Sequence, residues 1–318
     1  MRKFLVAFTA AVAVIASARA QQFPQRPVTL IQGYTAGGPF DILARGLAER
    51  MQEKWKQPVN VEARPGNGAM LAADHVAKQA PDGYTLHLAA DYIISINMAV
   101  NRKLDYDMLK EFTVIAPISS IVLAAVANSS FPPNNIAELI AYIKANPGKV
   151  NLGVWSFGGF QQLAGAIVAE RAGAPMTEVP YKGSSNATPD LVEGRINLVF
   201  DTPSAQQSFV ESGKAKLLGV TSKQRLARFP NVPAIAETIP GYDVVSWAVL
   251  LAPAGMPEAL ADRLNREMTE VVKSSSVQAI LDKFGWVTTT AARQNFHQEV
   301  RRKAEEWRRM APSLKPAN

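Results

Sequence analysis

Hydrophobic positions in this chain form short apolar runs that alternate with amphipathic stretches. The run at 28–32 predicts a buried strand, and the stretch at 39–55 carries Leu43, Leu47, Met51 and Trp55 at every fourth position. A spacing of four predicts a helix with one apolar stripe. The glycine-rich segment between the two predicts a tight turn.

The same alternation continues through the rest of the chain and predicts further strands and helices. Further strands are expected near 59–61, 84–89, 150–154, 178–181, 196–200, 217–220 and 244–251. Helices are expected near 68–79, 135–146, 161–172, 189–194 and 204–212, and from about residues 257, 276 and 291. Strand–helix–strand units of this length predict α/β folding, with parallel sheets covered by helices on both faces.

Two apolar stretches, at 118–126 and 244–251, flank the middle α/β block. If both cross between lobes, the middle block is inserted into the first domain, and the molecule is a clamshell with a cleft at the strand ends. Two domains in series would give the same periodicity. The pattern alone leaves both arrangements open.

The N-terminus predicts export. Arg2 and Lys3 precede an apolar run at 4–16, and Ala18-Arg19-Ala20 offers small residues for a signal peptidase. We therefore expect residues 1–20 to be a signal peptide and the mature chain to be soluble and periplasmic. Apolar residues make up 47% of the chain, enough for packed cores, and there is no cysteine, which excludes disulfides and attachment of a lipid to cysteine.

The formal charge of +7 does not indicate a nucleic-acid partner. Much of the positive charge lies at 301–309, where Glu305 and Glu306 separate the basic residues. Such interleaving predicts a solvated helix face rather than a basic patch.

Four segments together resemble the tripartite tricarboxylate transporter receptors, also called Bug extracytoplasmic solute receptors. They are Ala36-Gly37-Gly38-Pro39-Phe40-Asp41, Arg64-Pro65-Gly66-Asn67-Gly68, Ala80-Pro81-Asp82-Gly83-Tyr84-Thr85-Leu86 and Val179-Pro180-Tyr181-Lys182-Gly183-Ser184. The resemblance implies a two-lobed, type II-like periplasmic-binding-protein clamshell, each lobe a sheet flanked by helices. The expected limits of the two lobes are residues 21–120 plus 246–318 for lobe 1 and residues 121–245 for lobe 2.

The resemblance also implies a function. A small organic solute, by family default a carboxylate, would be captured and delivered to the membrane permease subunits, without catalysis or a cofactor. A receptor that signals to a membrane sensor kinase would have the same fold and is the alternative. The candidate ligand-binding residues are Tyr34, Gly37, Gly38, Phe40, Asp41, Ala90, Asp91, Trp155, Ser156, Phe157, Gly158, Lys182, Gly183, Asp201 and Thr202.

The chemistry of these residues suits an anion. Gly37 and Gly38 lack a β-carbon, so backbone N–H groups could approach a ligand at the positive end of the following helix. Asp41 could instead cap that helix, and Asp201 could brace a loop through backbone N–H groups. Lys182 could face the ligand or lie on the surface.

This chain departs from the family where aromatic and acidic residues replace small hydroxyl residues. Phe40 follows the glycine turn, Ala90 and Asp91 follow the third strand, and the segment 155–160 contains three aromatic residues. An unpaired Asp91 would repel a carboxylate, and aromatic faces favour stacking or cations. These departures favour a ligand with an aromatic or nitrogen-bearing body, unless the rings pack inward.

An exported hydrolase is the rival class. Its Ser/His/Asp system needs a histidine, and His75 and His297 are expected in helices and His87 in a strand. The spacing of Gly153, Ser156 and Gly158 does not match the Gly-x-Ser-x-Gly elbow.

Overall fold

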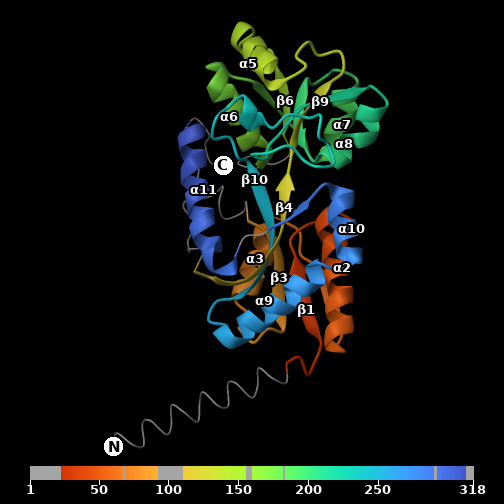
Figure 1. Ribbon diagram of the computed structural model, residues 1–318, viewed down its shortest axis with the longest axis vertical. Helices are drawn as coiled ribbons and strands as arrows, with labels where there is room; N and C mark the ends of the chain where they lie inside the picture. Colours follow the sequence, from red (N-terminus) through yellow and green to blue (C-terminus); the bar gives the residue numbers. More distant parts are fainter. Residues whose placement is uncertain are drawn as a thin grey trace, which may run out of the picture.

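The computed structural model describes residues 23–66, 69–91, 110–154, 160–181, 183–289 and 292–312. Within them the chain forms two separate mixed sheets, one of six strands and one of five, each flanked by helices (Figure 1). The predicted two-lobed α/β fold is confirmed. We call the six-stranded sheet with its helices the first lobe, and the five-stranded sheet with its helices the second lobe.

The first lobe is built on strands from both ends of the chain. Their order across the sheet is β11 (Val287–Thr288), β4 (Phe112–Val122), β10 (Val245–Pro253), β3 (Thr85–Ala90), β1 (Val28–Gln32) and β2 (Val59–Ala63). β1 pairs in parallel with β2 and β3, as the strand–helix alternation predicted, whereas β10 returns antiparallel to β3 and β4.

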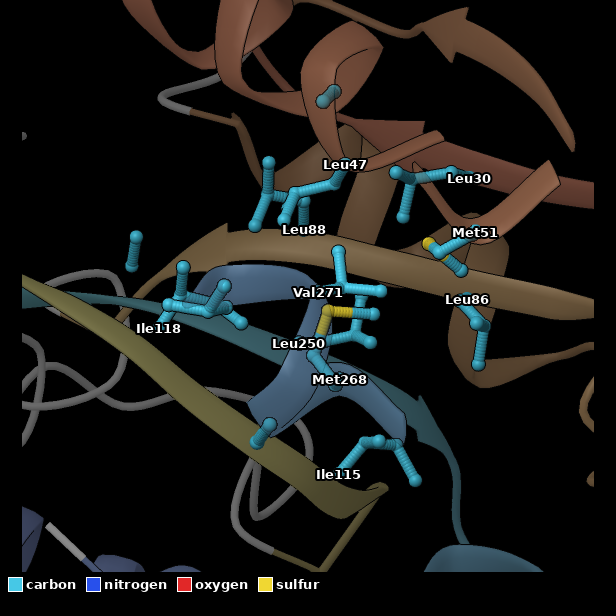
Figure 2. Packing of buried hydrophobic residues seen from close by; sticks show 14 of the residues in the cluster. Leu30, Leu47, Met51, Leu86, Leu88, Ile115, Ile118, Leu250, Met268 and Val271 are labelled. Carbon is cyan, nitrogen blue, oxygen red and sulfur yellow. The ribbon is translucent and has the colours of Figure 1, made fainter. Parts of the chain in front are cut away.

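Helices cover both faces of this sheet. On one face lie α2 (Pro39–Trp55), α9 (Glu258–Val272) and α10 (Ser275–Phe284), and on the other α3 (Met70–Ala77) and the start of α11 (Phe296–Met310). Figure 2 shows side chains of the first face packed between α2, α9 and the strands, among them Leu30, Leu47, Met51, Leu86, Leu88, Ile115, Leu250, Met268 and Val271. The apolar stripe predicted for α2 is therefore its buried face.

All strands of the second lobe lie between residues 124 and 220. Their order is β7 (Thr177–Pro180), β6 (Asn151–Val154), β8 (Leu198–Asp201), β5 (Ala124–Asn128) and β9 (Ala215–Val220). α5 (Ile136–Ala145), α6 (Phe160–Ala172) and the end of α11 pack on one face, and α7 (Ser184–Val192) and α8 (Pro203–Glu211) pack on the other.

Local sequence explains the start of α5 but not the start of α7. Asn135 caps α5 by accepting a hydrogen bond from Glu138 N at 2.9 Å. A helix was predicted at 189–194 and α7 overlaps that range, but the predicted start was five residues too late, because Pro189 lies inside α7 rather than at its first residue. The helix begins just after Gly183, and Thr188 Oγ1 donates to Ser184 O at 2.9 Å within it.

The two lobes are joined where β4 continues into β5 and where the chain enters β10. Leu123 separates β4 from β5, and Val244 immediately precedes β10. α11 contributes to the cores of both lobes, so the exact lobe limits stay a prediction. Among the described residues, no helix combines the length and apolar character that crossing a membrane requires.

Candidate functional site

The carboxyl ends of six strands face the junction between the lobes. At the end of β3, Ala90 pairs with Ala248, close to where β10 leaves the junction. At the end of β8, Asp201 pairs with Ala124, the first residue of β5 after the crossing. β1 and β2 run parallel to β3, and β6 and β7 run parallel to β8. The loops that follow these strands therefore meet at the junction, where open α/β sheets bind their ligands.

On the first-lobe side, Asp41 organises the glycine turn before α2. Its carboxylate is buried and accepts hydrogen bonds from Gly37 N at 3.0 Å, Gln32 Nε2 at 3.3 Å and Arg45 Nε at 2.9 Å. The hydrogen bond from Arg45 lowers the pKa of Asp41 most strongly. Asp41 is thus an ionised brace inside the protein, with its oxygens already occupied.

The N–H groups of Gly37 and Gly38 are also occupied within the turn. Gly37 N donates to Asp41, and Gly38 N donates to Thr35 O at 3.2 Å. The turn instead places the first helical amides, those of Phe40 and Asp41, where the helix offers them no carbonyl acceptor. Gly37 has φ of 78°, and a β-carbon on it would meet nothing within 4 Å, so the space in front of the turn is open.

Phe40 packs inward. Its exposed fraction is 7%, and its ring stacks on Tyr34 at 4.3 Å and lies 5.2 Å from the ring of Trp286. Tyr34 is partly buried, and its N–H donates to Gln32 Oε1 at 2.6 Å. The ring of Phe40 therefore belongs to the core of the first lobe.

Ala90 and Asp91, at the end of β3, are buried as well. Asp91 Oδ1 accepts from Ser246 Oγ at 2.7 Å and from Trp247 N at 2.5 Å, and Asp91 N donates to Trp247 O at 2.9 Å. Asp91 is fully buried and paired with β10, which differs from the unpaired carboxylate that the sequence suggested. The sequence around Asp91 could not predict this pairing, because Ser246 lies 155 positions away in the chain.

On the second-lobe side, Asp201 joins the starts of α7 and α8. It accepts from the hydroxyl of Ser184, from Gln206 Nε2 at 2.8 Å and from Thr202 N at 2.8 Å. Burial raises the pKa of Asp201, and these three hydrogen bonds lower it in part. Gly183 precedes α7 and Thr202 precedes α8, so both residues stand at helix amino ends.

Sequence reasoning missed Ser204 and Trp286, which lie where the lobes touch. A β-carbon on Gly285, beside Trp286, would be 3.4 Å from Ser204 Oγ. Within the described residues, neither the buried Ser204 Oγ nor the buried Trp286 Nε1 has a hydrogen-bond partner. The Pro203 that starts α8 was the available signal, because proline is common at the first helical position and so marks Ser204 as lying at the amino end of a helix.

The other predicted site residues lie outside the described residues: Trp155, Ser156, Phe157, Gly158 and Lys182. Phe160, which follows them, is buried in the second-lobe core with 3% exposed. The described part of the chain contains no group of three His, Asp or Glu side chains suited to a metal ion.

The arrangement favours an anion. Three helices, α2, α7 and α8, begin at the junction, and helix amino ends carry partial positive charge. The nearby carboxylates of Asp41, Asp91 and Asp201 are already bound by internal donors. The donors left without an internal partner at the junction include the first amides of these helices and, among the described residues, the buried Ser204 hydroxyl.

Comparisons with known proteins agree with this geometry. A family model described as "Tripartite tricarboxylate transporter family receptor" matches residues 43–315. The "UPF0065 protein in tcbD-tcbE intergenic region" of Pseudomonas sp. (strain P51) is 32% identical over 320 residues, which cover 97% of this chain and 93% of that protein.

Two solved structures share the fold over nearly their whole length. A protein of R. palustris with adipate is 31% identical with a TM-score of 0.80, covering 92% of this chain and 98% of that one. MatC from Rhodopseudomonas palustris with bound malate is 28% identical with a TM-score of 0.77, covering 91% of this chain and 100% of that one.

Proposed function

Because the chain belongs to the tripartite tricarboxylate transporter receptor family, we propose that it binds a small dicarboxylate between its lobes and delivers it to the permease subunits of such a transporter. Export to the periplasm after cleavage near Ala20 is part of this proposal. The role is binding without catalysis, as for the receptors of the family.

The occupied state of the buried acids is the observation that carries the proposal. A receptor that binds a cation or a nitrogen donor through a carboxylate needs that carboxylate to be free of internal donors. The carboxylate of Asp91, the residue that favoured such a ligand, is occupied by hydrogen bonds from the hydroxyl of Ser246 and the N–H of Trp247. Phe40 and Phe160, two of the aromatic residues that favoured an aromatic ligand, are core residues. The relatives with malate and adipate support the dicarboxylate.

The amino ends of α2 in the first lobe and of α7 and α8 in the second supply the positive ends for two carboxylates. A dicarboxylate that spans the junction would place one group against each lobe. Closing the lobes on it would remove water and strengthen each hydrogen bond to charge. Ser204 is the side chain for which we propose direct contact with a carboxylate, since its hydroxyl lies buried and without a partner among the described residues.

A thermal-shift screen tests the ligand class. We expect malate or adipate to raise the melting temperature, with a stabilisation of about 2.7 kcal/mol at a hundred times the dissociation constant. The uncharged diamides of the same acids and quaternary amines should give no shift. A larger shift with an amine than with any dicarboxylate would contradict the proposal.

Calorimetric titration of Ser204→Ala with the best dicarboxylate of that screen tests the contact. Losing a hydrogen bond to a charged group costs about 1.5–3 kcal/mol, so affinity should fall roughly 10- to 100-fold. Ser276→Ala is the matched control, because Ser276 is also the second residue of its helix and its hydroxyl is also buried without a partner in the described chain. It lies at the end of α10 remote from Gly285 and should leave affinity unchanged.

A further inference from the structure

The C-terminal helix α11 spans both lobes. Its first half contributes Phe296 and Val300 to the core of the first lobe, and its second half contributes Ala304 and Trp307 to the core of the second. Figure 1 shows α11 running alongside the junction from one lobe to the other. Any rotation of one lobe against the other therefore involves this helix.

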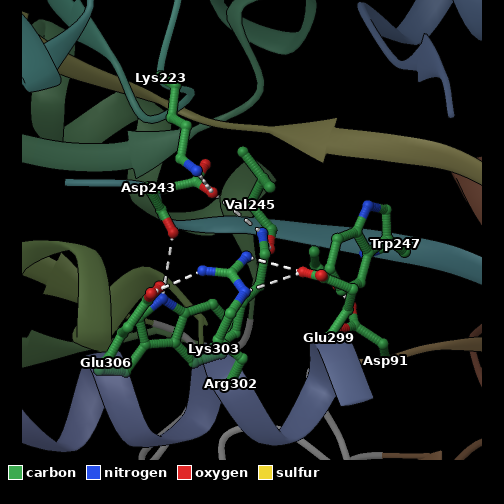
Figure 3. Close-up of polar contacts among 11 residues, drawn as sticks. Asp91, Lys223, Asp243, Val245, Trp247, Glu299, Arg302, Lys303 and Glu306 are labelled. Atoms are coloured by element: carbon green, nitrogen blue, oxygen red, sulfur yellow. Dashed lines mark hydrogen bonds and ion pairs between the residues drawn. The ribbon is translucent and has the colours of Figure 1, made fainter. Parts of the chain in front are cut away.

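Between the two halves, α11 carries a buried lysine. Lys303 has 2% of its side chain exposed, so the prediction that this basic stretch forms a solvated face was wrong for this residue. Lys303 Nζ lies 3.4 Å from Val245 O, 3.4 Å from Asp243 Oδ2 and 4.2 Å from the ring centroid of Trp247 (Figure 3). All three contacts are made to one short segment of the chain.

That segment is the crossing between the lobes. Thr221 joins the two crossing strands, since Val244 N donates to Thr221 O at 3.0 Å and Leu123 N donates to Thr221 Oγ1 at 2.9 Å. Asp243 lies immediately before this point, and Val245 lies immediately after it. Lys303 thus contacts the chain on both sides of the crossing.

The charges around Lys303 are nearly balanced within the protein. Asp243 also lies 3.7 Å from Lys223, and Asp91 holds the other side of the segment through Trp247 N. Burial lowers the pKa of Lys303, while Asp243 and Asp91 oppose this and favour the ammonium. A buried ion pair is a poor source of stability compared with apolar packing, but it fixes one arrangement, because it requires specific distances and directions.

We propose that Lys303 is the pivot of the molecule, which fastens α11 to the interlobe crossing and sets the resting angle between the lobes. A methionine of similar length could fill the same space but would not bind Val245 O and Asp243 together. Without these contacts of Lys303, the free-energy difference that favours the resting interlobe angle becomes smaller. The lobes then sample a wider range of angles.

The absence of cysteine from the sequence makes a distance measurement direct. Spin labels placed through Glu49→Cys on α2 and Lys144→Cys on α5, both exposed, report the distance between the lobes in the ligand-free protein. With Lys303 intact we expect one dominant distance, with any second population at most about 10%. In Lys303→Met that second population should rise to roughly half.

Arg302→Met is the matched control. It removes a positive charge from the neighbouring position of α11, but Arg302 bonds Glu299 and Glu306 of the same helix (Figure 3). Its distance distribution should match that of the parent. If Lys303→Met proves unfolded by circular dichroism, Asp243→Asn removes the partner instead and should also raise the second population.

An unchanged distribution in the folded variant would overturn the proposal, as would an equal change in Arg302→Met. The measurement needs no ligand, so its failure would leave the proposed dicarboxylate function standing. Failure of the dicarboxylate screen would likewise leave the pivot untouched.

Discussion

At the residue scale, the same device appears in both lobes. Asp41 and Asp201 are buried carboxylates, and each accepts a backbone N–H and a side-chain amide, from Gln32 and Gln206 respectively. Asp41 lies in the first turn of α2, Asp201 is the last residue of β8 just before α8, and each holds the start of a helix in place. In the proposed site we therefore expect these acids to hold the strand ends and helix starts in place and not to contact the ligand.

Replacing Asp41 tests this role. In Asp41→Ala, Gly37 N and Gln32 Nε2 lose a buried acceptor, which we expect to cost about 1–3 kcal/mol of unfolding free energy and to weaken dicarboxylate binding. Arg45→Ala removes only the most exposed partner, whose side chain is 61% exposed, so it should change both quantities much less. Urea unfolding and calorimetric titration at pH 7 measure the two effects. Equal losses in both variants would show that the ion pair, and not the turn, matters.

His87 gives the molecule a defined dependence on pH. Its ring is fully buried in β3, Nδ1 donates to Ile31 O at 3.1 Å, and burial lowers its pKa from 6.5 to about 4. Between pH 4 and pH 6.5, His87 is therefore protonated in the unfolded chain but neutral in the folded chain. The contribution of His87 to the free energy of unfolding is fully present above pH 6.5 and is lost as the pH falls from 6.5 toward 4. Below pH 4 this group causes no further loss.

The loss amounts to about 3 kcal/mol when both ends of that range are compared. In His87→Leu this part of the loss should disappear, so the unfolding free energy of the parent minus that of the variant should be about 3 kcal/mol lower at pH 4 than at pH 7. Urea unfolding of both proteins at pH 7 and pH 4 gives the comparison. Identical pH dependence in the two would contradict the assignment to His87.

Residue roles could be predicted only where the partners are near in sequence. Asp41 braces a turn four positions away, and a capping role for it was among the expectations. The pairing of Asp91 with Ser246 and Trp247, and the contact of Lys303 with Val245, join distant parts of the chain. Whether a charge is free or satisfied depends on such contacts, and no periodicity carries that information.

At the element scale, most strands and helices follow from the local pattern. α2 begins and ends where its apolar stripe and Pro39 predicted. The start of α7 was predicted too late, because Pro189 suggested a helix start, whereas the helix begins just after Gly183. The two-residue β11 is too short for any alternation to show and is defined by its pairing with Ser119 and Ser120 of β4.

The turn before α2 offers a test that separates folding from binding. Gly37 has positive φ with open space around its α-carbon. Gly37→Val should lower stability by about 1–2 kcal/mol because a β-branched residue is strained there. Gly37→Asn tolerates that conformation and should remain nearly as stable as the parent, yet its side chain would fill the space in front of the turn.

Both Gly37 variants should therefore lose dicarboxylate affinity, although only the valine variant loses much stability. Melting temperatures of the ligand-free proteins and calorimetric titrations provide the two readouts. Normal affinity in Gly37→Asn would mean that the ligand does not approach this turn.

At the scale of the whole molecule, the lobes touch on both sides of the junction. α11 and Lys303 lie at the crossing, and elsewhere Arg228 of the second lobe donates to Asp282 O of α10 and, at 2.9 Å, to Gln207 Oε1 of α8. Apolar periodicity could not distinguish an inserted lobe from two domains in series, because both bury the same stripes. The resemblance of the glycine, Arg-Pro-Gly and Asp-Gly-Tyr segments to a known family was what favoured the clamshell.

A crystal structure of the protein with the dicarboxylate that binds best is the most direct test of its function. We expect the ligand between the lobes, with one carboxylate at the amino end of α2 and the other within hydrogen-bond distance of Ser204 Oγ. Asp41, Asp91 and Asp201 should keep their internal partners. A ligand bound away from the junction, or one whose contacts are made to any of these three carboxylates, would contradict the proposed site.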